Sequence, residues 1–187
     1  MLISITCLSF VFQILQTSLP KTMDIRLSAS MDLSTSEIGY IVSAIYVVSG
    51  LMNYVGGILA DKYSEKIIYA IGIIGQGCLL LLIISLSNYW LIAICLIIVA
   101  FNSSILPAEN LLLARFAPEK YQSLVYGIKF ILAFGSGPIS VFLISEIYSI
   151  TLEFTYLFLI NAIMMGIVSI FIIFLPIHSN QRIATQD

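Results

Sequence analysis

The segment GILADKYSEK, residues 57–66, places a short charged turn between two hydrophobic stretches that are each long enough to cross a lipid bilayer. A transmembrane helix needs about 20 mainly apolar residues to cross about 30 Å of hydrocarbon. Stretches of this kind lie near residues 2–19, 37–60, 67–86, 89–113, 122–145 and 152–175. We therefore predict one six-helix transmembrane domain at residues 1–176, followed by a cytoplasmic tail at 177–187.

Composition supports an all-α membrane protein. Hydrophobic residues make up 60% of the chain and charged residues only 10%, whereas charged residues make up about a quarter of a typical soluble domain. The apolar runs are continuous and lack the alternation of a transmembrane barrel, so helices are expected in contact with the lipid bilayer. The net charge of −2 and the scattered basic residues argue against a nucleic-acid partner.

Residue types that carry catalysis or bind metals are sparse. The three cysteines fall inside apolar runs without metal-ligand spacing, and His178 is the only histidine. The sequence has no HExxH or GxSxG motif. We therefore expect neither an enzyme nor a metal site, and no cofactor.

The charged turn also carries a family resemblance. It is similar to the signature loop of the major facilitator superfamily, in which a glycine is followed by an aspartate and then by basic residues. Four residues fit this pattern: Gly57, Asp61, Lys62 and Lys66. Ser64 and Glu65 depart from it. The loop at 115–120 and the segment at 126–130 also resemble this superfamily, particularly the C-terminal six-helix half of a twelve-helix transporter.

The resemblance implies a specific architecture. The six helices would form two inverted three-helix repeats, with the first, second, fourth and fifth helices inside and the third and sixth outside. The polarity of the predicted helices agrees with this division, because the third and sixth are nearly uniformly apolar and should face lipid. In this superfamily the substrate site lies between two six-helix halves.

Basic residues predict the orientation in the membrane. Lys62, Lys66, Arg115, Lys120 and Arg182 would lie on one side, and Lys21 and Arg26 on the other. Because basic residues favour the cytoplasmic side, both termini should be cytoplasmic in a protein of the cell membrane. We expect Pro20 to follow the first span and residues 21–32 to form a long connection that could lie along the membrane surface.

The second span has a stripe of small and polar residues on one helical face. Its members are Gly39, Ser43, Tyr46, Gly50, Asn53 and Gly57. Such a stripe indicates either a close helix–helix seam or the lining of a cavity. In the second interpretation Tyr46 and Asn53 would be contact residues, together with Gln13 and Gln16 of the first span and Asn102 of the fourth.

Glu109 and Lys129 are the charges deepest in the predicted spans, at equal sequence distance from the loop that joins their helices. An unpaired charge at this depth costs at least roughly 2.5–3.5 kcal/mol. We therefore expect the two side chains either to pair or to face water in a cavity. Alternatively, Lys129 extends to the cytoplasmic interface and Glu109 bonds locally. In a proton-driven transporter Glu109 would be the candidate proton carrier.

The turn contains a carboxylate in an electrostatically unfavourable position. A carboxylate at the C-terminal end of a helix is disfavoured by the helix dipole, so Asp61 calls for a cation such as Lys62, Lys66 or Arg115. The resemblance implies that this loop acts as a latch on the cytoplasmic gate. The alternative is a solvated turn that only fixes orientation.

Together these observations predict secondary active transport of a small solute, of unknown identity, by alternating access. One six-helix unit would leave its polar stripes uncovered, so it should need a partner half or a second copy in a homodimer. A non-transporting membrane interaction subunit and a truncated transporter remnant remain alternatives.

Overall fold

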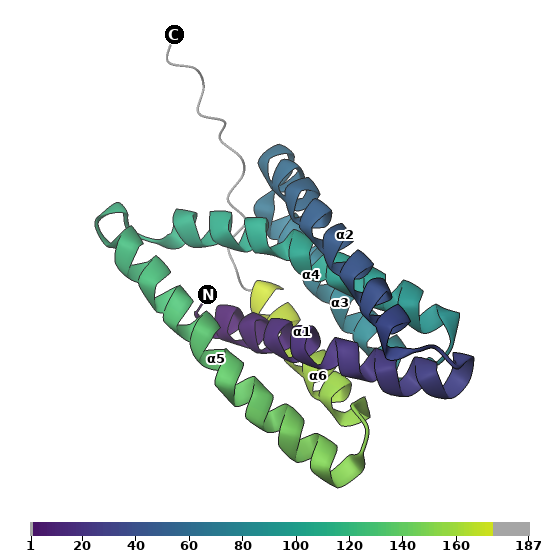
Figure 1. The fold of residues 1–187 in the computed structure, drawn as a ribbon. Helices are drawn as coiled ribbons and strands as arrows, with labels where there is room; N and C mark the ends of the chain where they lie inside the picture. Colours follow the sequence, from purple (N-terminus) through teal and green to yellow (C-terminus); the bar gives the residue numbers. More distant parts are fainter. Residues whose placement is uncertain (1, 174–187) are drawn as a thin grey trace.

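The computed structural model describes residues 2–173, which form six long α-helices (Figure 1). These are α1 Leu2–Met31, α2 Thr35–Lys62, α3 Glu65–Leu82, α4 Tyr89–Phe116, α5 Gln122–Thr151 and α6 Thr155–Ile173, with short 3₁₀ turns at Ile83–Ser85 and Glu119–Tyr121. Each long helix is apolar enough to cross a membrane, which confirms the predicted all-α, six-span fold. The predicted tail at 177–187, with Arg182, lies outside the described residues.

Helix α1 is longer than the sequence suggested. The prediction that the first span ends at Leu19 and that a connection covers 21–32 is wrong, because α1 continues through Pro20 to Met31. Proline lacks the amide that would bond the carbonyl four residues earlier, here that of Gln16. The Tyr46 hydroxyl of α2 donates to this carbonyl at 3.0 Å. A neighbouring helix thus satisfies the carbonyl that Pro20 leaves free.

Helix α2 begins as expected. The Ser34 hydroxyl accepts from the Glu37 amide, and the Glu37 carboxylate accepts from the Ser34 amide at 2.9 Å. This reciprocal capping box satisfies two backbone donors at the helix start. The other spans agree with their predicted positions apart from shifts at their ends, of which the largest extends α5 to Thr151.

Arg26 fixes three helices at the end of the domain opposite the charged turn. Its guanidinium donates to the carbonyls of Ile83 at 2.7 Å and Leu86 at 3.2 Å, just beyond α3. It also donates to the Thr155 hydroxyl at the start of α6 at 3.3 Å. A cation at the C-terminal end of a helix interacts favourably with the helix dipole. Arg26 therefore joins the ends of α1, α3 and α6.

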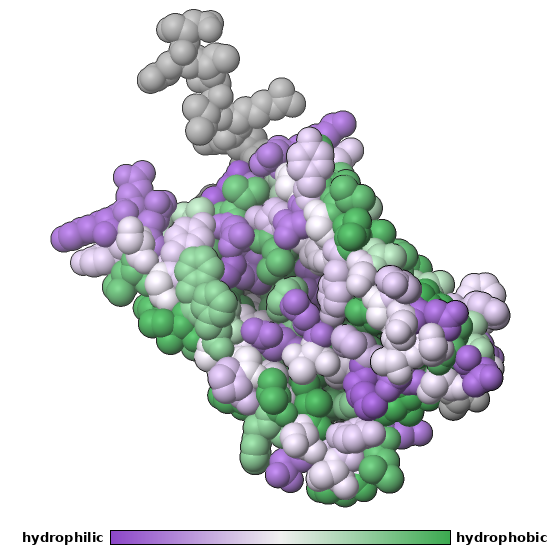
Figure 2. Space-filling view, in the orientation of Figure 1, coloured by the Kyte–Doolittle hydropathy of each residue, from purple (hydrophilic) through white to green (hydrophobic). Residues whose placement is uncertain are grey.

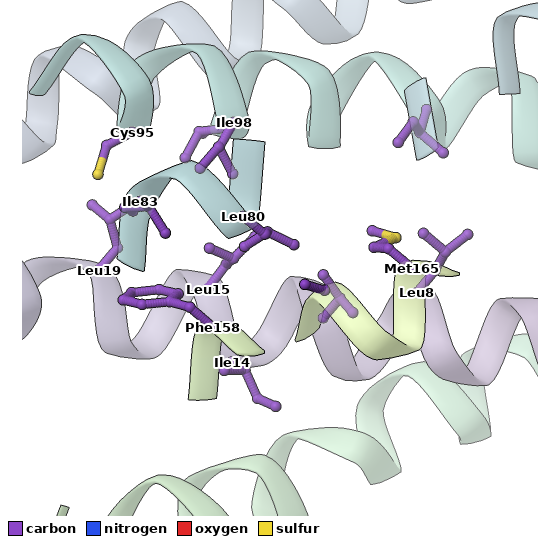
Figure 3. Packing of buried hydrophobic residues seen from close by; sticks show 14 of the residues in the cluster. Leu8, Ile14, Leu15, Leu19, Leu80, Ile83, Cys95, Ile98, Phe158 and Met165 are labelled. Carbon is purple, nitrogen blue, oxygen red and sulfur yellow. The ribbon is translucent and has the colours of Figure 1, made fainter. Parts of the chain in front are cut away.

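The packing of the helices supports two inverted repeats. Helix α2 packs on α4 as α5 packs on α1, and α3 packs on α4 as α6 packs on α1. Exchanging the first three helices with the last three thus reproduces the same neighbours. The hydrophobic core lies where α1, α3, α4 and α6 meet, with Leu15, Leu80, Ile98 and Phe158 among its residues (Figure 3).

The outer helices do not only face lipid. Helices α3 and α6 each have an exposed apolar face, as an outer helix should. Their opposite faces pack on each other and bury Gln76 and Asn161 completely. Tyr69 of α3 is also fully buried. These three side chains are therefore part of the interior.

The seam between α2 and α4 uses a different face of α2 from the predicted stripe. A Cβ atom at Gly56 would lie 2.6 Å from the backbone oxygen of Ser104, so the two helices are in close contact there. At Gly39, Gly50 and Gly57 a Cβ atom would have no neighbour within 4 Å. The stripe is therefore no helix–helix seam within the described residues.

This difference gives a test of the fold. Gly56→Ala should destabilise the protein by about 1–3 kcal/mol, because the new methyl group forces α2 away from α4. Gly50→Ala is the matched control and should be neutral or stabilising, since alanine has the higher helix propensity. Thermal unfolding of both variants in the same detergent measures the difference. Equal melting temperatures would show that the close contact at Gly56 is absent.

Candidate functional site

A cavity of about 330 Å³ opens between α1, α2, α4 and α5. Figure 2 shows hydrophilic side chains in a hollow near the centre of one face of the molecule, with hydrophobic ones around it. Five of the seven residues predicted to line a cavity lie here: Gln13, Asn53, Asn102, Glu109 and Lys129. The lining also includes the polar side chains of Ser9 and Asn110 and the aromatic rings of Phe12, Phe130 and Phe134.

The two remaining predicted residues line a smaller neighbouring pocket of about 70 Å³. Gln16 and Tyr46 lie there, and Asn102 and Phe12 border both spaces. The structure thus brings together all seven residues predicted for the cavity. The Tyr46 hydroxyl, however, already donates to the Gln16 carbonyl, so the backbone of α1 engages it.

The deepest feature of the cavity is an ion pair. The Lys129 ammonium lies 2.6 Å from a carboxylate oxygen of Glu109, and both side chains are almost completely buried. Lys129 also donates to the amide oxygen of Asn110 at 2.5 Å. The expected contact between Glu109 and Lys129 is therefore present. A buried pair of this kind needs such additional hydrogen bonds, because two charges leave water when it forms.

Local sequence places the pair on kinked or softened helices. Pro107 lies two residues before Glu109 inside α4, and Pro138 lies inside α5. Each proline removes one backbone hydrogen bond and is a cause of helix kinks. Helices α4 and α5 diverge from the turn that joins them (Figure 1), and polar bonds bridge them. Besides the pair, the Tyr126 hydroxyl donates to the Asn110 carbonyl at 3.0 Å.

The predicted gating loop lies at the same end of the domain as a second ion pair, in which the carboxylate is buried and the guanidinium is exposed. Arg115, at the end of α4, lies 2.6 Å from the carboxylate of Glu65 at the start of α3. Glu65 is buried, whereas Asp61 is exposed. Within residues 2–173 the partner found for Arg115 is thus Glu65 rather than Asp61. The loop residues Gly57, Asp61, Lys62 and Lys66 lie beside this pair in the chain.

Sequence reasoning missed two side chains of this region. Glu65 departs from the expected loop pattern, so the pattern gave no reason to pair it with Arg115. Ser49 lies one position before Gly50 of the predicted stripe on α2, and its hydroxyl is hydrogen-bonded to that of Ser103. Asn110, in contrast, belongs with Asn102 and Glu109 to the polar pattern that the sequence of the fourth span indicates.

These features define an integral membrane protein whose inner helices surround a cavity with polar and charged groups in a largely apolar wall, the architecture of a membrane transporter. The family model of the Major Facilitator Superfamily matches residues 1–186. The chain therefore belongs to this superfamily, whose members are membrane transporters. A search of curated proteins gave no match to the sequence.

A double-mutant cycle tests the buried pair. Glu109→Gln or Lys129→Met alone should destabilise the protein by about 3–5 kcal/mol, because each leaves the other charge buried without its partner. The double variant should lose much less than the sum of the two. Thermal or chemical unfolding in detergent measures all four proteins.

The control is a cycle on the more exposed pair of Lys21 and Asp24, whose charged atoms lie 2.7 Å apart. With Lys21→Met and Asp24→Asn the coupling should be only about 0.2–1 kcal/mol, as for other exposed ion pairs. Strictly additive losses at Glu109 and Lys129 would show that these side chains do not interact.

Proposed function

We propose that this six-helix unit takes part in secondary active transport of a small solute by alternating access. The observation that carries the proposal is the cavity with the ion pair of Glu109 and Lys129 in its wall. Charged residues inside a membrane are costly and commonly mark substrate or ion pathways. Glu109 is then the carrier of the coupling proton, and the cavity residues of the other inner helices contact the solute.

The proposal includes a partner for the inner helices. The glycines Gly39, Gly50 and Gly57 of α2 and Gly127 and Gly135 of α5 leave space above their backbones that no described residue fills. Small residues on exposed helical faces allow another helix to approach closely in a membrane. A second six-helix half or a second copy of this unit would cover these faces and close the cavity.

The charged loop is proposed as the cytoplasmic latch. The Glu65–Arg115 pair ties the start of α3 to the end of α4, which gives the turn at Asp61, Lys62 and Lys66 a rigid base. Asp61 is exposed and free to contact a partner half across the gate. In this role the loop affects the exchange between inward and outward states and does not contact the solute.

Accessibility of the cavity tests this function without a known solute. In a background without Cys7, Cys78 and Cys95, Asn53→Cys should react with an impermeant thiol reagent both from outside cells and in inside-out vesicles. Asp61→Asn should change the ratio of the two labelling rates, because it alters the latch. Glu119→Gln removes an exposed carboxylate of the α4–α5 loop on the same side. It is the matched control and should leave the ratio of labelling rates unchanged. Labelling from one side only would contradict alternating access.

The proposed orientation places the α2–α3 and α4–α5 loops in the cytoplasm of a protein of the cell membrane, with both termini on that side. In the same cysteine-free background, Ser87→Cys between α3 and α4 should be labelled from outside intact cells. Ser123→Cys at the start of α5 should be labelled only after the membrane is opened. Both serines are exposed, so access to the reagent depends on the side of the membrane. The reverse result would overturn the orientation.

A further inference from the structure

Tyr69 of α3 is a buried polar side chain that the transport mechanism does not yet use. Its exposed fraction is 0%, and its hydroxyl has no hydrogen-bond partner among the described residues. A buried hydroxyl without a partner costs roughly 1–3 kcal/mol. Such a cost is explained if the hydroxyl has a hydrogen-bond partner in another state of the protein.

The contacts between α3 and α4 show what Tyr69 faces. A side chain at Gly75 would meet Phe101, one at Gly72 would meet Ile105, and Glu65 pairs with Arg115. The residue numbers of the contacting positions thus fall on α3 as they rise on α4, as in an antiparallel pair of helices. This register places Tyr69 opposite Glu109.

Lys129 of α5 is the ion-pair partner of Glu109. Lys129 borders the cavity, whereas Tyr69 does not. Glu109 therefore lies between a cation on the cavity side and a hydroxyl on the core side.

We infer that Tyr69 is the positioning residue that receives the Glu109 side chain when its ion pair with Lys129 opens. This inference rests on the proposed role of Glu109 as proton carrier. A protonated carboxyl group has no net charge and loses most of its attraction to Lys129, but it still needs hydrogen-bond partners in a buried site. The tyrosine hydroxyl both donates and accepts, so it can bond the protonated acid.

The exchange has a structural consequence. With Lys129 as partner, Glu109 ties α4 to α5 across the cavity. With Tyr69 as partner, Glu109 ties α4 to α3, with which it already packs closely. Protonation would thus remove the ionic bond between α4 and α5 without leaving the Glu109 carboxyl group unpaired, while the bonds of Lys129 and Tyr126 to Asn110 remain. Tyr69 thus provides the protonated Glu109 with a partner on α3.

Infrared spectroscopy on the purified protein tests the bond directly, without solute and without transport. Lowering the pH should produce a C=O stretching band of the protonated Glu109 carboxyl group, identified by its loss in Glu109→Gln. Tyr69→Phe removes only the hydroxyl and should move this band to higher wavenumber, because the carboxyl group loses a hydrogen bond. Tyr156→Phe on the exposed face of α6 is the control and should leave the band in place.

A stability cycle gives the second readout. Tyr69→Phe should lower the melting temperature in a Lys129→Met background, because Glu109 then depends on the hydroxyl, but not in the wild type, in which the hydroxyl has no partner among the described residues. A purely structural tyrosine would cost the same in both backgrounds. Equal costs together with an unmoved band would overturn the assignment. If the wild type shows neither solute transport nor alternating accessibility but the band still moves, the bond stands and only the transport role fails.

Discussion

A charge inside the hydrocarbon must have a partner. In this protein that requirement joins α4 and α5, which have few other contacts with each other. Helices α4 and α5 diverge from their connecting turn. Helix α4 packs closely on α2 and α3, whereas α5 packs closely on α1. Lys129 connects them by bonding both Glu109 and Asn110. The shape of the cavity depends on this bridge, because its wall is formed by the residues that the bridge holds in place.

Backbone N–H and C=O groups inside the hydrocarbon must have partners too. This requirement shows which parts of the fold could be predicted from the sequence and which could not. The six spans follow from hydrophobic length, because nothing else lets a chain cross a bilayer. The end of the first span does not follow from local sequence. Where it continues past Pro20, the free carbonyl of Gln16 is bonded by the hydroxyl of Tyr46, 30 residues after Gln16 in the chain. A proline in a membrane helix can be placed only when its neighbours are known.

The candidate site shows the same division. Glu109 and Lys129 could be paired from sequence, because charges at matched depth on helices joined by a short turn have few other partners. Which face of α2 meets α4 could not be predicted, because glycines occur on adjacent faces and neighbouring residues differ by only about 100° around the helix. Gly56 proved to be the contact residue and Gly57 did not. Glu65 was missed because it departs from the expected loop pattern, and its bond to Arg115 depends on how α3 packs on α4.

Arg26 has a consequence for the order in which the protein is made. Its hydrogen-bond partners lie 57, 60 and 129 residues later in the chain. At synthesis rates of about 5–20 residues per second, the ribosome needs roughly 6–26 s to go from Arg26 to Thr155. The Ile83 and Leu86 carbonyls are made within this time, but the full set of Arg26 bonds can form only after the start of α6 has been made. The final seating of α1 is therefore a late event in the synthesis of this six-helix unit.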